Sequence, residues 1–317
     1  MRICLLEPRG FDDEAENTLI KMGSVTLYTG SGDLYDFLSY TDPEALFVRL
    51  NYEIDRHLFI ATPNLKVICS PTTGLDHIDL EECQKRGITV LSLQGETEFL
   101  RDIPATAEHT WGLILALTRC IPWAFEDVKR GNWHRDSFRG NELKGKTLGI
   151  VGLGRIGGQV LQYAEAFGIR KTLAFDPSFY GRMTSHLSLS TLGWLFRSSD
   201  IITIHVPLND STRGLIGAKE LVAMKPTAFL VNTSRGQVID EAALETALQN
   251  RTIAGAALDV LADEWGEIKD NPLVKYARTH QNLLLTPHLG GCTVESMAAT
   301  ERFMVKKLQK FMANGAK

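Results

Sequence analysis

The chain has 317 residues, of which 44% are hydrophobic and 23% are charged, as in ordinary globular proteins. Its length suggests two domains, at roughly 150 residues per domain. The 34 Lys and Arg and 38 Asp and Glu give a net charge of −4, without the basic cluster that nucleic-acid binding requires. The longest apolar stretch, residues 111–117, is far shorter than the roughly 20 residues of a membrane-spanning helix. We therefore expect neither nucleic acid nor membrane as a partner.

The cysteines and the N-terminus point to a reducing compartment. The five cysteines are odd in number and never spaced as C-x-x-C, so we expect reduced structural thiols and no metal site. Near the start, Glu7 and Pro8 follow before a signal-like apolar core can form. The sequence therefore predicts a cytoplasmic protein.

Short apolar runs rich in Val and Ile alternate with amphipathic stretches of helical length, which favours parallel sheets covered by helices. In the first third of the chain we expect strands at residues 2–6, 25–28, 45–49 and 67–70, and helices at 12–22 and 80–85. A second series of strands is expected at residues 147–152, 171–175, 201–206, 228–232, 254–258 and 283–286.

Three further helices complete the predicted organisation. One covers residues 159–167 and ends before Gly168, which can adopt a left-handed cap. Two longer ones, residues 105–119 and 294–312, are expected to cross between two domains. The fold class is therefore α/β, with two doubly wound parallel-sheet domains. The boundaries place residues 1–101 and 290–317 in one domain and 102–289 in the other.

A glycine-rich turn between a strand and a helix predicts a dinucleotide site. Gly152, Gly154 and Gly157 form a G-x-G-x-x-G motif that also contains Arg155 and Ile156, and Asp176 follows 19 residues after Gly157. The glycines permit a tight turn, close approach of a pyrophosphate and close helix packing, and the acidic residue binds ribose hydroxyls. Asp176 favours NAD over NADP, although Arg182 lies near in sequence. The alternative is a glycine-rich turn without a ligand.

Motifs along nearly the whole chain resemble the D-isomer-specific 2-hydroxyacid dehydrogenase family, and phosphoglycerate dehydrogenase and its relatives in particular. Besides the glycine turn, they are residues 74–79 (GLDHID), 107–110 (AEHT), 131–133 (GNW), 205–208 (HVPL), 230–236 (LVNTSRG), 238–241 (VIDE), 257–264 (ALDVLADE) and 285–293 (LTPHLGGCT). The resemblance implies two Rossmann-like domains with an active-site cleft between them. Residues 102–289 would be the NAD-binding domain and the other segments the substrate domain.

The resemblance implies a catalytic set of Arg235, Glu264 and His288. A guanidinium suits bidentate binding of a carboxylate, and an imidazole exchanges protons near neutral pH. A carboxylate beside the imidazole orients it and stabilises its charged form. Taken one by one, each residue could instead be an ordinary loop residue.

The resemblance also assigns residues to the two ligands. Besides the glycine turn, Asp176 and His288, the cofactor site is expected to include Thr73, Val206, Thr233 and Asp259, with Asp259 near the nicotinamide carboxamide. The substrate site is expected to include Arg49, Thr72, Gly74 and Arg235. Four other residues are interpreted as structural: Trp133 and His205 in packing, and His77 and His109.

Some positions depart from the pattern of the family. Trp265 stands where proline commonly follows the catalytic glutamate, and residues 94–101 form a longer segment than in typical relatives. Ser70 stands where the phosphoglycerate enzymes often have an arginine, whereas Arg49 matches another arginine of those enzymes. Whether the substrate is phosphorylated therefore stays open. Since the sequence ends at Lys317, we expect no regulatory domain.

The leading hypothesis is an NAD-dependent oxidoreductase that interconverts a small D-2-hydroxy acid and its 2-oxo acid. We expect a homodimer formed through the NAD-binding domain, as in the family. A non-catalytic NAD-sensing binding protein of the same fold is the main alternative. A hydrolase that uses NAD transiently is a third, and the Arg, Glu and His set argues against it.

Overall fold

A computed structural model describes residues 1–179, 181 and 186–315 of the chain. Arg182 and Lys317, which the sequence analysis names, lie outside the described residues. The chain divides into two compact units, one formed by Met1–Ile103 and Cys292–Lys317 and the other by Pro104–Gly291. These divisions lie two residues from the boundaries expected at 101/102 and 289/290. Both units are parallel α/β sheets, as the sequence predicts.

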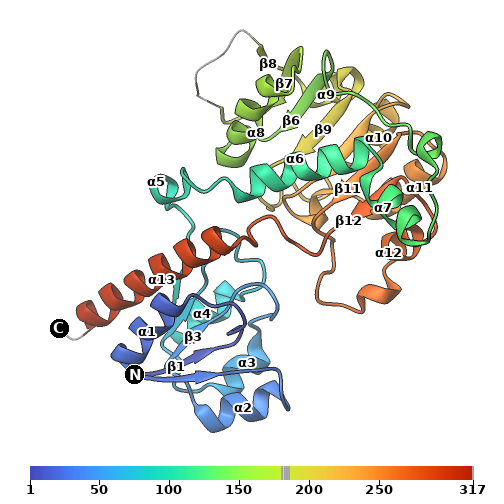
Figure 1. Cartoon of the computed structure of the whole chain (residues 1–317). Helices are drawn as coiled ribbons and strands as arrows, with labels where there is room; N and C mark the ends of the chain where they lie inside the picture. Colours follow the sequence, from blue (N-terminus) through green and yellow to red (C-terminus); the bar gives the residue numbers. More distant parts are fainter. Residues whose placement is uncertain (180, 182–185, 316–317) are drawn as a thin grey trace. The chain divides into compact units, whose positions relative to one another are not determined.

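The first unit is built on a five-stranded parallel sheet of order β2-β1-β3-β4-β5 (Figure 1). Its strands are β1 (Arg2–Leu5), β2 (Ser24–Leu27), β3 (Ala45–Phe47), β4 (Val67–Cys69) and β5 (Thr89–Leu91). Its helices are α1 (Asp13–Met22), α2 (Leu34–Thr41), α3 (Arg56–Ala61), α4 (Leu80–Arg86), α5 (Thr97–Leu100) and α13 (Val294–Gly315). Strand β5 is absent from the sequence prediction.

Alternating residues of these strands build two cores, because successive side chains of a strand point to opposite faces. Cys4, Leu46 and Ile68 face a cluster that also contains residues of α2, α3 and α4. Ile3 and Leu5 face a second cluster with residues of α1, α5 and α13. The C-terminal helix α13 therefore packs on the unit that begins the chain, beside α1 (Figure 1).

The second unit is built on a seven-stranded parallel sheet of order β12-β11-β10-β9-β6-β7-β8. Its strands are β6 (Thr147–Val151), β7 (Lys171–Phe175), β8 (Leu187–Leu189), β9 (Ile201–Ile204), β10 (Phe229–Asn232), β11 (Gly255–Leu258) and β12 (Leu283–Leu285). Its α-helices are α6 (Ala105–Thr118), α7 (Ile121–Lys129), α8 (Arg155–Ala166), α9 (Leu192–Ser198), α10 (Ala218–Ala223), α11 (Glu241–Gln249) and α12 (Pro272–Ala277). Three short 3₁₀ helices are η1 (Arg135–Phe138), η2 (Gly236–Val238) and η3 (Ile268–Asp270). Strand β8 is absent from the sequence prediction.

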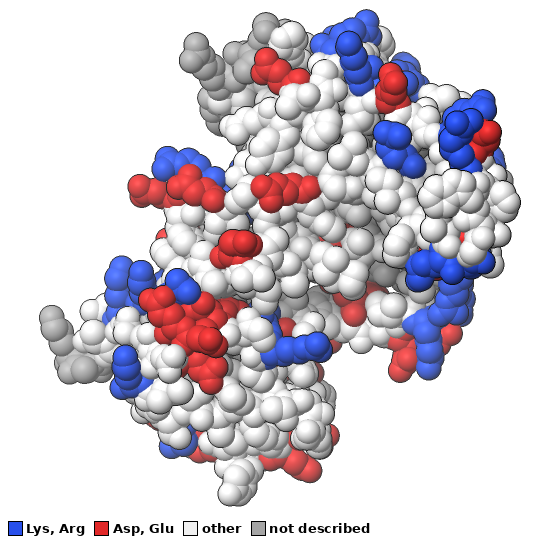
Figure 2. Space-filling view, viewed as in Figure 1, with Lys and Arg blue, Asp and Glu red and all other residues white. Residues whose placement is uncertain are grey.

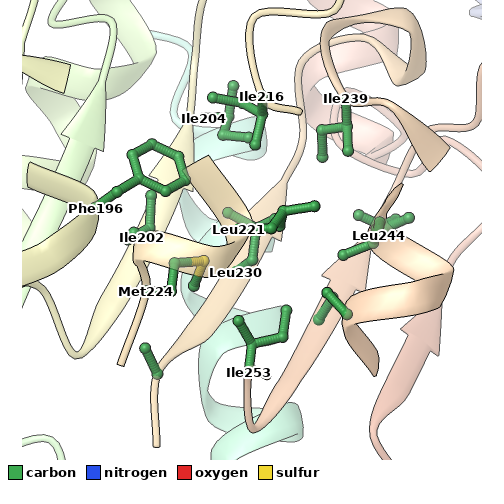
Figure 3. Close-up of a cluster of buried hydrophobic side chains, with 14 of the residues drawn as sticks. Phe196, Ile202, Ile204, Ile216, Leu221, Met224, Leu230, Ile239, Leu244 and Ile253 are labelled. Carbon is green, nitrogen blue, oxygen red and sulfur yellow. The ribbon is translucent and has the colours of Figure 1, made fainter. Parts of the chain in front are cut away.

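The seven-stranded sheet carries helices on both faces. Leu230 of β10 faces a cluster with residues of α9 to α12 (Figure 3), while its neighbour Val231 faces a cluster with residues of α6 and α8. Helix α6 packs against β10, β11 and β12 and beside α8. It therefore lies next to the strands that carry the three catalytic candidates.

Helix α8 begins at Arg155, four residues earlier than the sequence predicts. The prediction was wrong because Gly157 and Gly158 are poor helix formers and suggested a later start. Here Gly157 lies inside the helix, and a Cβ atom at this position would lie 2.1 Å from the carbonyl oxygen of Gly152. The glycine is therefore required for packing of the helix against the preceding turn.

The charged side chains are mixed over the surface. On the face shown in Figure 2, acidic and basic residues lie among one another. None of the helices in the described parts of the chain is long and apolar enough to cross a membrane.

Two neighbouring residues of α10 give a matched test of the core in the second unit. Leu221 is fully buried, whereas Val222 is 71% exposed. Leu221→Ala should lower the free energy of unfolding by about 2–5 kcal/mol, because it removes buried methyl groups and leaves a cavity. Val222→Ala should change it by less than about 0.5 kcal/mol. Urea unfolding followed by circular dichroism measures both, and equal effects of the two substitutions would contradict this description of the core.

Candidate active site and cofactor site

The three catalytic candidates lie after neighbouring strands at one edge of the sheet. Asn232 of β10, Leu258 of β11 and Leu285 of β12 are in register. Arg235, Glu264 and His288 follow these strands in the same order. Because parallel strands end at a common edge, and ligands of open α/β sheets bind there, the fold brings the segments that carry these side chains together.

Glu264 and His288 form a direct pair. His288 Nδ1 lies 2.7 Å from Glu264 Oε2, and both side chains are 23% exposed. Glu264 Oε1 also accepts a hydrogen bond from the backbone N–H of Leu261 at 3.2 Å. The carboxylate is thereby fixed to its own loop and bound to one nitrogen of the imidazole. The pair has the geometry in which a carboxylate orients a histidine for proton transfer.

The loop that carries His288 is tied to Asp259, which is 1% exposed. Asp259 Oδ1 accepts hydrogen bonds from Thr286 Oγ1 (2.6 Å) and from the backbone N–H of Leu289 (2.8 Å), and Oδ2 accepts one from the N–H of Gly290 (2.8 Å). Burial opposes ionisation of Asp259, but these bonds and one with His109 outweigh it and keep the pKa of the carboxyl below its usual range. The expected contact of this side chain with the cofactor stays a prediction, since its described partners belong to the protein.

Arg235 lies in a tight loop after β10. Asn232 shapes this loop, because its Oδ1 accepts hydrogen bonds from the N–H and hydroxyl of Ser234 and its Nδ2 donates to the carbonyl of Arg235. The guanidinium Nη1 donates to the carbonyl of Ser234 at 2.7 Å. The half-buried cation is thus held at the strand end while part of the side chain reaches solvent.

Two residues that the sequence analysis did not assign hold the loop of Glu264. Gln237 donates to the carbonyl of Ala262 at 2.7 Å, and Glu241 accepts the N–H of the same residue at 2.6 Å. A Cβ atom at Gly236 would lie 1.9 Å from the backbone carbon of Leu261, so the two segments are in direct contact. The segment after Arg235 therefore positions Glu264. The motif at residues 238–241 was noted in the sequence, but its pattern does not reveal this contact.

The glycine turn fits a dinucleotide. Gly152 has a φ of 91°, and a Cβ atom there would lie 2.6 Å from the carbonyl oxygen of His205. At Gly154, by contrast, a Cβ atom would meet no atom within 4 Å, which leaves room for a phosphate above the start of α8. The N–H groups of Ile156 and Gly157 lie in the first turn of this helix, a position that suits an anion.

Asp176 lies directly after β7 and faces this turn. Its Oδ2 accepts the N–H of Leu153 and its Oδ1 that of Ser178, both at 2.8 Å. The carboxylate is therefore fixed at the place where a ribose would approach. Val206 lines the same turn, because its Cγ1 atom would lie 2.9 Å from a Cβ at Gly152.

Other residues of the predicted site have different environments. Thr233 is buried, and its hydroxyl lies 2.9 Å from that of Thr110 in α6. Burial lowers the pKa of His205 to about 3, which suits a neutral packing residue. His109, interpreted as structural from the sequence, lies 3.0 Å from Asp259 Oδ1. It belongs to the network that supports His288, a contact that the AEHT motif at residues 107–110 does not reveal.

Four of the expected ligand residues lie in the first unit. Arg49 is bound within that unit: its Nη1 lies 3.3 Å from Glu301 Oε1, and its Nη2 donates to the carbonyls of Glu7 and Arg9. The Thr72 hydroxyl lies 2.8 Å from that of Ser70 and donates to the carbonyl of Gly74, and Thr73 is exposed. The contacts of these four residues with ligands stay predictions.

Comparison with known proteins gives a consistent picture. Over 315 residues the chain is 36% identical to a D-3-phosphoglycerate dehydrogenase of Methanocaldococcus jannaschii, covering 98% of this chain and 57% of that protein. It is 41% identical over 262 residues to a glyoxylate reductase of Thermofilum pendens, covering 80% and 74%. A D-lactate dehydrogenase from Aquifex aeolicus, solved with NAD and lactic acid, superposes with a TM-score of 0.77 at 27% identity, over 99% of this chain and 96% of that one.

The chain spans about half the length of the curated D-3-phosphoglycerate dehydrogenases that it matches. Residues 111–290, more than half of the chain, match the family model "D-isomer specific 2-hydroxyacid dehydrogenase, NAD binding domain". This range contains the glycine turn, Asp176 and the three catalytic candidates. The chain therefore belongs to the D-isomer specific 2-hydroxyacid dehydrogenase family, and its cofactor is NAD.

Proposed function

We propose that the protein is an NAD-dependent dehydrogenase that interconverts a small D-2-hydroxy acid and the corresponding 2-oxo acid. The observation that carries this proposal is the 2.7 Å contact between His288 Nδ1 and Glu264 Oε2. It lies at the same sheet edge as Arg235, in the unit that contains the NAD-binding domain. The relatives support the reaction class, since their names include a glyoxylate reductase and a D-lactate dehydrogenase.

Each candidate side chain has a role in this reaction. When bound, NADH supplies a hydride to the carbonyl carbon of the 2-oxo acid. Arg235 binds the substrate carboxylate and polarises the carbonyl. Because Nδ1 of His288 contacts Glu264, its Nε2 is the nitrogen that gives a proton to the developing alkoxide. In the opposite direction the same nitrogen accepts the proton of the hydroxyl group.

Glu264 serves the histidine in two ways. Its hydrogen bond fixes the rotation of the imidazole ring and selects the nitrogen that faces the substrate. Its negative charge stabilises the protonated ring, which is the form that donates to the substrate. In the reducing direction Glu264 therefore orients the ring for transfer of its proton.

The substrate is a small 2-oxo acid that Arg235 holds by its carboxylate. We propose that the first unit is the substrate domain, with Arg49, Thr72 and Gly74 contacting the substrate and Thr73 the cofactor. The ion pair of Arg49 with Glu301 means that a substrate phosphate would have to compete for this guanidinium. Assays with matched phosphorylated and unphosphorylated substrates decide whether the preferred substrate carries a phosphate.

The proposed activity is tested with a panel of 2-oxo acids. The purified chain should oxidise NADH in the presence of glyoxylate, pyruvate, hydroxypyruvate or 3-phosphohydroxypyruvate, with a clear preference for one of them. It should also reduce NAD⁺ with the D form of the matching hydroxy acid and not with the L form. Absorbance at the NADH band measures both rates. Tight binding of NADH without turnover of any 2-oxo acid would favour the NAD-sensing alternative and contradict the proposal.

Variants of the pair serve as controls in the same assay. His288→Ala should lower kcat by about 10²- to 10⁴-fold, the usual contribution of an acid or base, while NADH still binds. Glu264→Gln keeps a hydrogen-bonding group but removes the charge. Its kcat in the reducing direction should fall most steeply at high pH, where the imidazole is least readily protonated. A Glu264→Gln profile that superposes on the wild-type profile would exclude this role.

The position of Asp176 predicts that the chain binds NADH about tenfold or more tightly than NADPH. A carboxylate that accepts hydrogen bonds from the ribose hydroxyls repels a 2′-phosphate. Asp176→Ala should narrow the difference by weakening NADH binding and improving NADPH binding. Ser178→Ala is the matched control, since only the backbone N–H of Ser178 contacts Asp176. Fluorescence titration measures the affinities. Equal affinity of the wild-type chain for both cofactors would contradict the assignment.

We propose that the chain forms a homodimer through its second unit, by way of α7. No residue of this helix is buried, and Ile121, Phe125 and Val128 form an exposed apolar stripe at helical spacing, followed by the largely exposed Trp133. Phe125→Glu should therefore shift the chain from dimer to monomer in sedimentation velocity. Tyr40→Glu, at a more exposed aromatic residue of the first unit, should not. A monomeric wild-type chain would contradict the proposal.

The cysteines support a cytoplasmic location, which we also propose. All five are free thiols, and Cys4, Cys69 and Cys83 are buried. Free structural thiols are typical of reducing compartments. Fractionation of cells that express the chain would contradict this location if the protein were found outside the cytosolic fraction.

A further inference from the structure

His109 on α6 contacts the network that supports His288. Its Nε2 lies 3.0 Å from Asp259 Oδ1 and 3.2 Å from Thr286 Oγ1. The side chain is 21% exposed, while the carboxylate that it contacts is 1% exposed. Through His109, helix α6 therefore contacts the buried carboxylate of Asp259. The other hydrogen-bond donors to this carboxylate lie in the loop after β12.

The hydrogen-bonding pattern defines the proton on His109. An ionised carboxylate only accepts hydrogen bonds, and Thr286 Oγ1 already donates its proton to Asp259 Oδ1. The Nε2 atom must therefore carry a proton, which it shares between the carboxylate oxygen and the hydroxyl oxygen. Every group in this set then has a partner, as buried polar networks require.

The same carboxylate fixes the backbone next to His288. The N–H groups of Leu289 and Gly290 donate to Asp259 Oδ1 and Oδ2, and the N–H of His288 donates to the carbonyl oxygen of Asp259 at 2.8 Å. His288 adopts a φ of 54°, a left-handed conformation that is uncommon for residues other than glycine. The bonds to Asp259 therefore determine the direction in which the imidazole leaves the backbone.

Helix α6 also packs closely against this loop. A Cβ atom at Gly290 would lie 3.1 Å from Thr106 Cγ2, and Thr106 and His109 are three residues apart on the helix, so they share a face. The network thus has a rigid support on one side. Loss of the His109 donor would leave the carboxylate with only the donors of the loop that it has to hold.

We propose that His109 is a positioning residue for the reaction, which acts through Asp259 to hold the His288 loop in its left-handed conformation. The proposal rests on the proposed function of His288 as the proton donor. It assigns to α6 a part in catalysis although His109 does not contact the reacting atoms. Misplacement of a reacting group by about 1 Å can lower a rate by about 10²-fold, which sets the scale of the effect.

Two substitutions separate the hydrogen bond from the packing. His109→Leu removes the donor and His109→Gln replaces it with an amide N–H at a similar reach, and both residues are good helix formers. His109→Leu should lower kcat by about 10- to 100-fold, with a larger solvent deuterium isotope effect, because proton transfer becomes more strongly rate-limiting. His109→Gln should recover most of the loss. A kcat or solvent isotope effect unchanged in His109→Leu, or no recovery of kcat in His109→Gln, would overturn the proposal.

A second measurement does not depend on activity. Hydrogen exchange of the peptide that contains Leu289 and Gly290 should be about tenfold faster in His109→Leu, and near the wild-type rate in His109→Gln. If the wild-type chain turns over no 2-oxo acid, the proposed function fails, and the exchange rates alone decide whether His109 holds the loop. Equal exchange rates in the wild-type chain and His109→Leu would overturn the positioning role, whatever the activity.

Discussion

The buried carboxylate of Asp259 is the constraint on which the arrangement of the site depends. A charge that is removed from water is tolerated only where hydrogen bonds replace its hydration. Here the donors come from helix α6 and from three positions of the loop after β12. Since the carboxylate needs all of them, helix, loop and strand end are fixed relative to one another, and the direction of His288 follows.

A second constraint connects the other two candidates. Gly236 lies against the backbone of Leu261, and the side chains of Gln237 and Glu241 hold both polar groups of the Ala262 backbone. Burial raises the pKa of Glu241, so the loop is held by a group that is less readily ionised than an ordinary glutamate. The segment that follows Arg235 and the segment that carries Glu264 are therefore held together.

Much of this arrangement could be predicted from the sequence, because its signals are local. The glycine turn, the alternating strands and the order of Arg235, Glu264 and His288 are visible as residue patterns. Strands β5 (TVL) and β8 (LSL) were missed because each is three residues long and contains a polar residue, whereas β12, equally short and also at a sheet edge, is the wholly apolar LLL. The start of α8 was misplaced because Gly157 is required by packing against Gly152, which helix propensity does not show. His109 and Gln237 were missed because their partners are far away in the sequence.

The left-handed backbone of His288 means that stability and chemistry make opposite demands on one position. A glycine would adopt this conformation without the steric clash that a side chain causes, so selection for a more robust fold favours it there. The proposed reaction requires an imidazole at this position, where the surrounding bonds enforce a locally unfavourable conformation. A variant engineered for a higher melting temperature would therefore have to keep His288 and gain its stability from substitutions elsewhere in the chain.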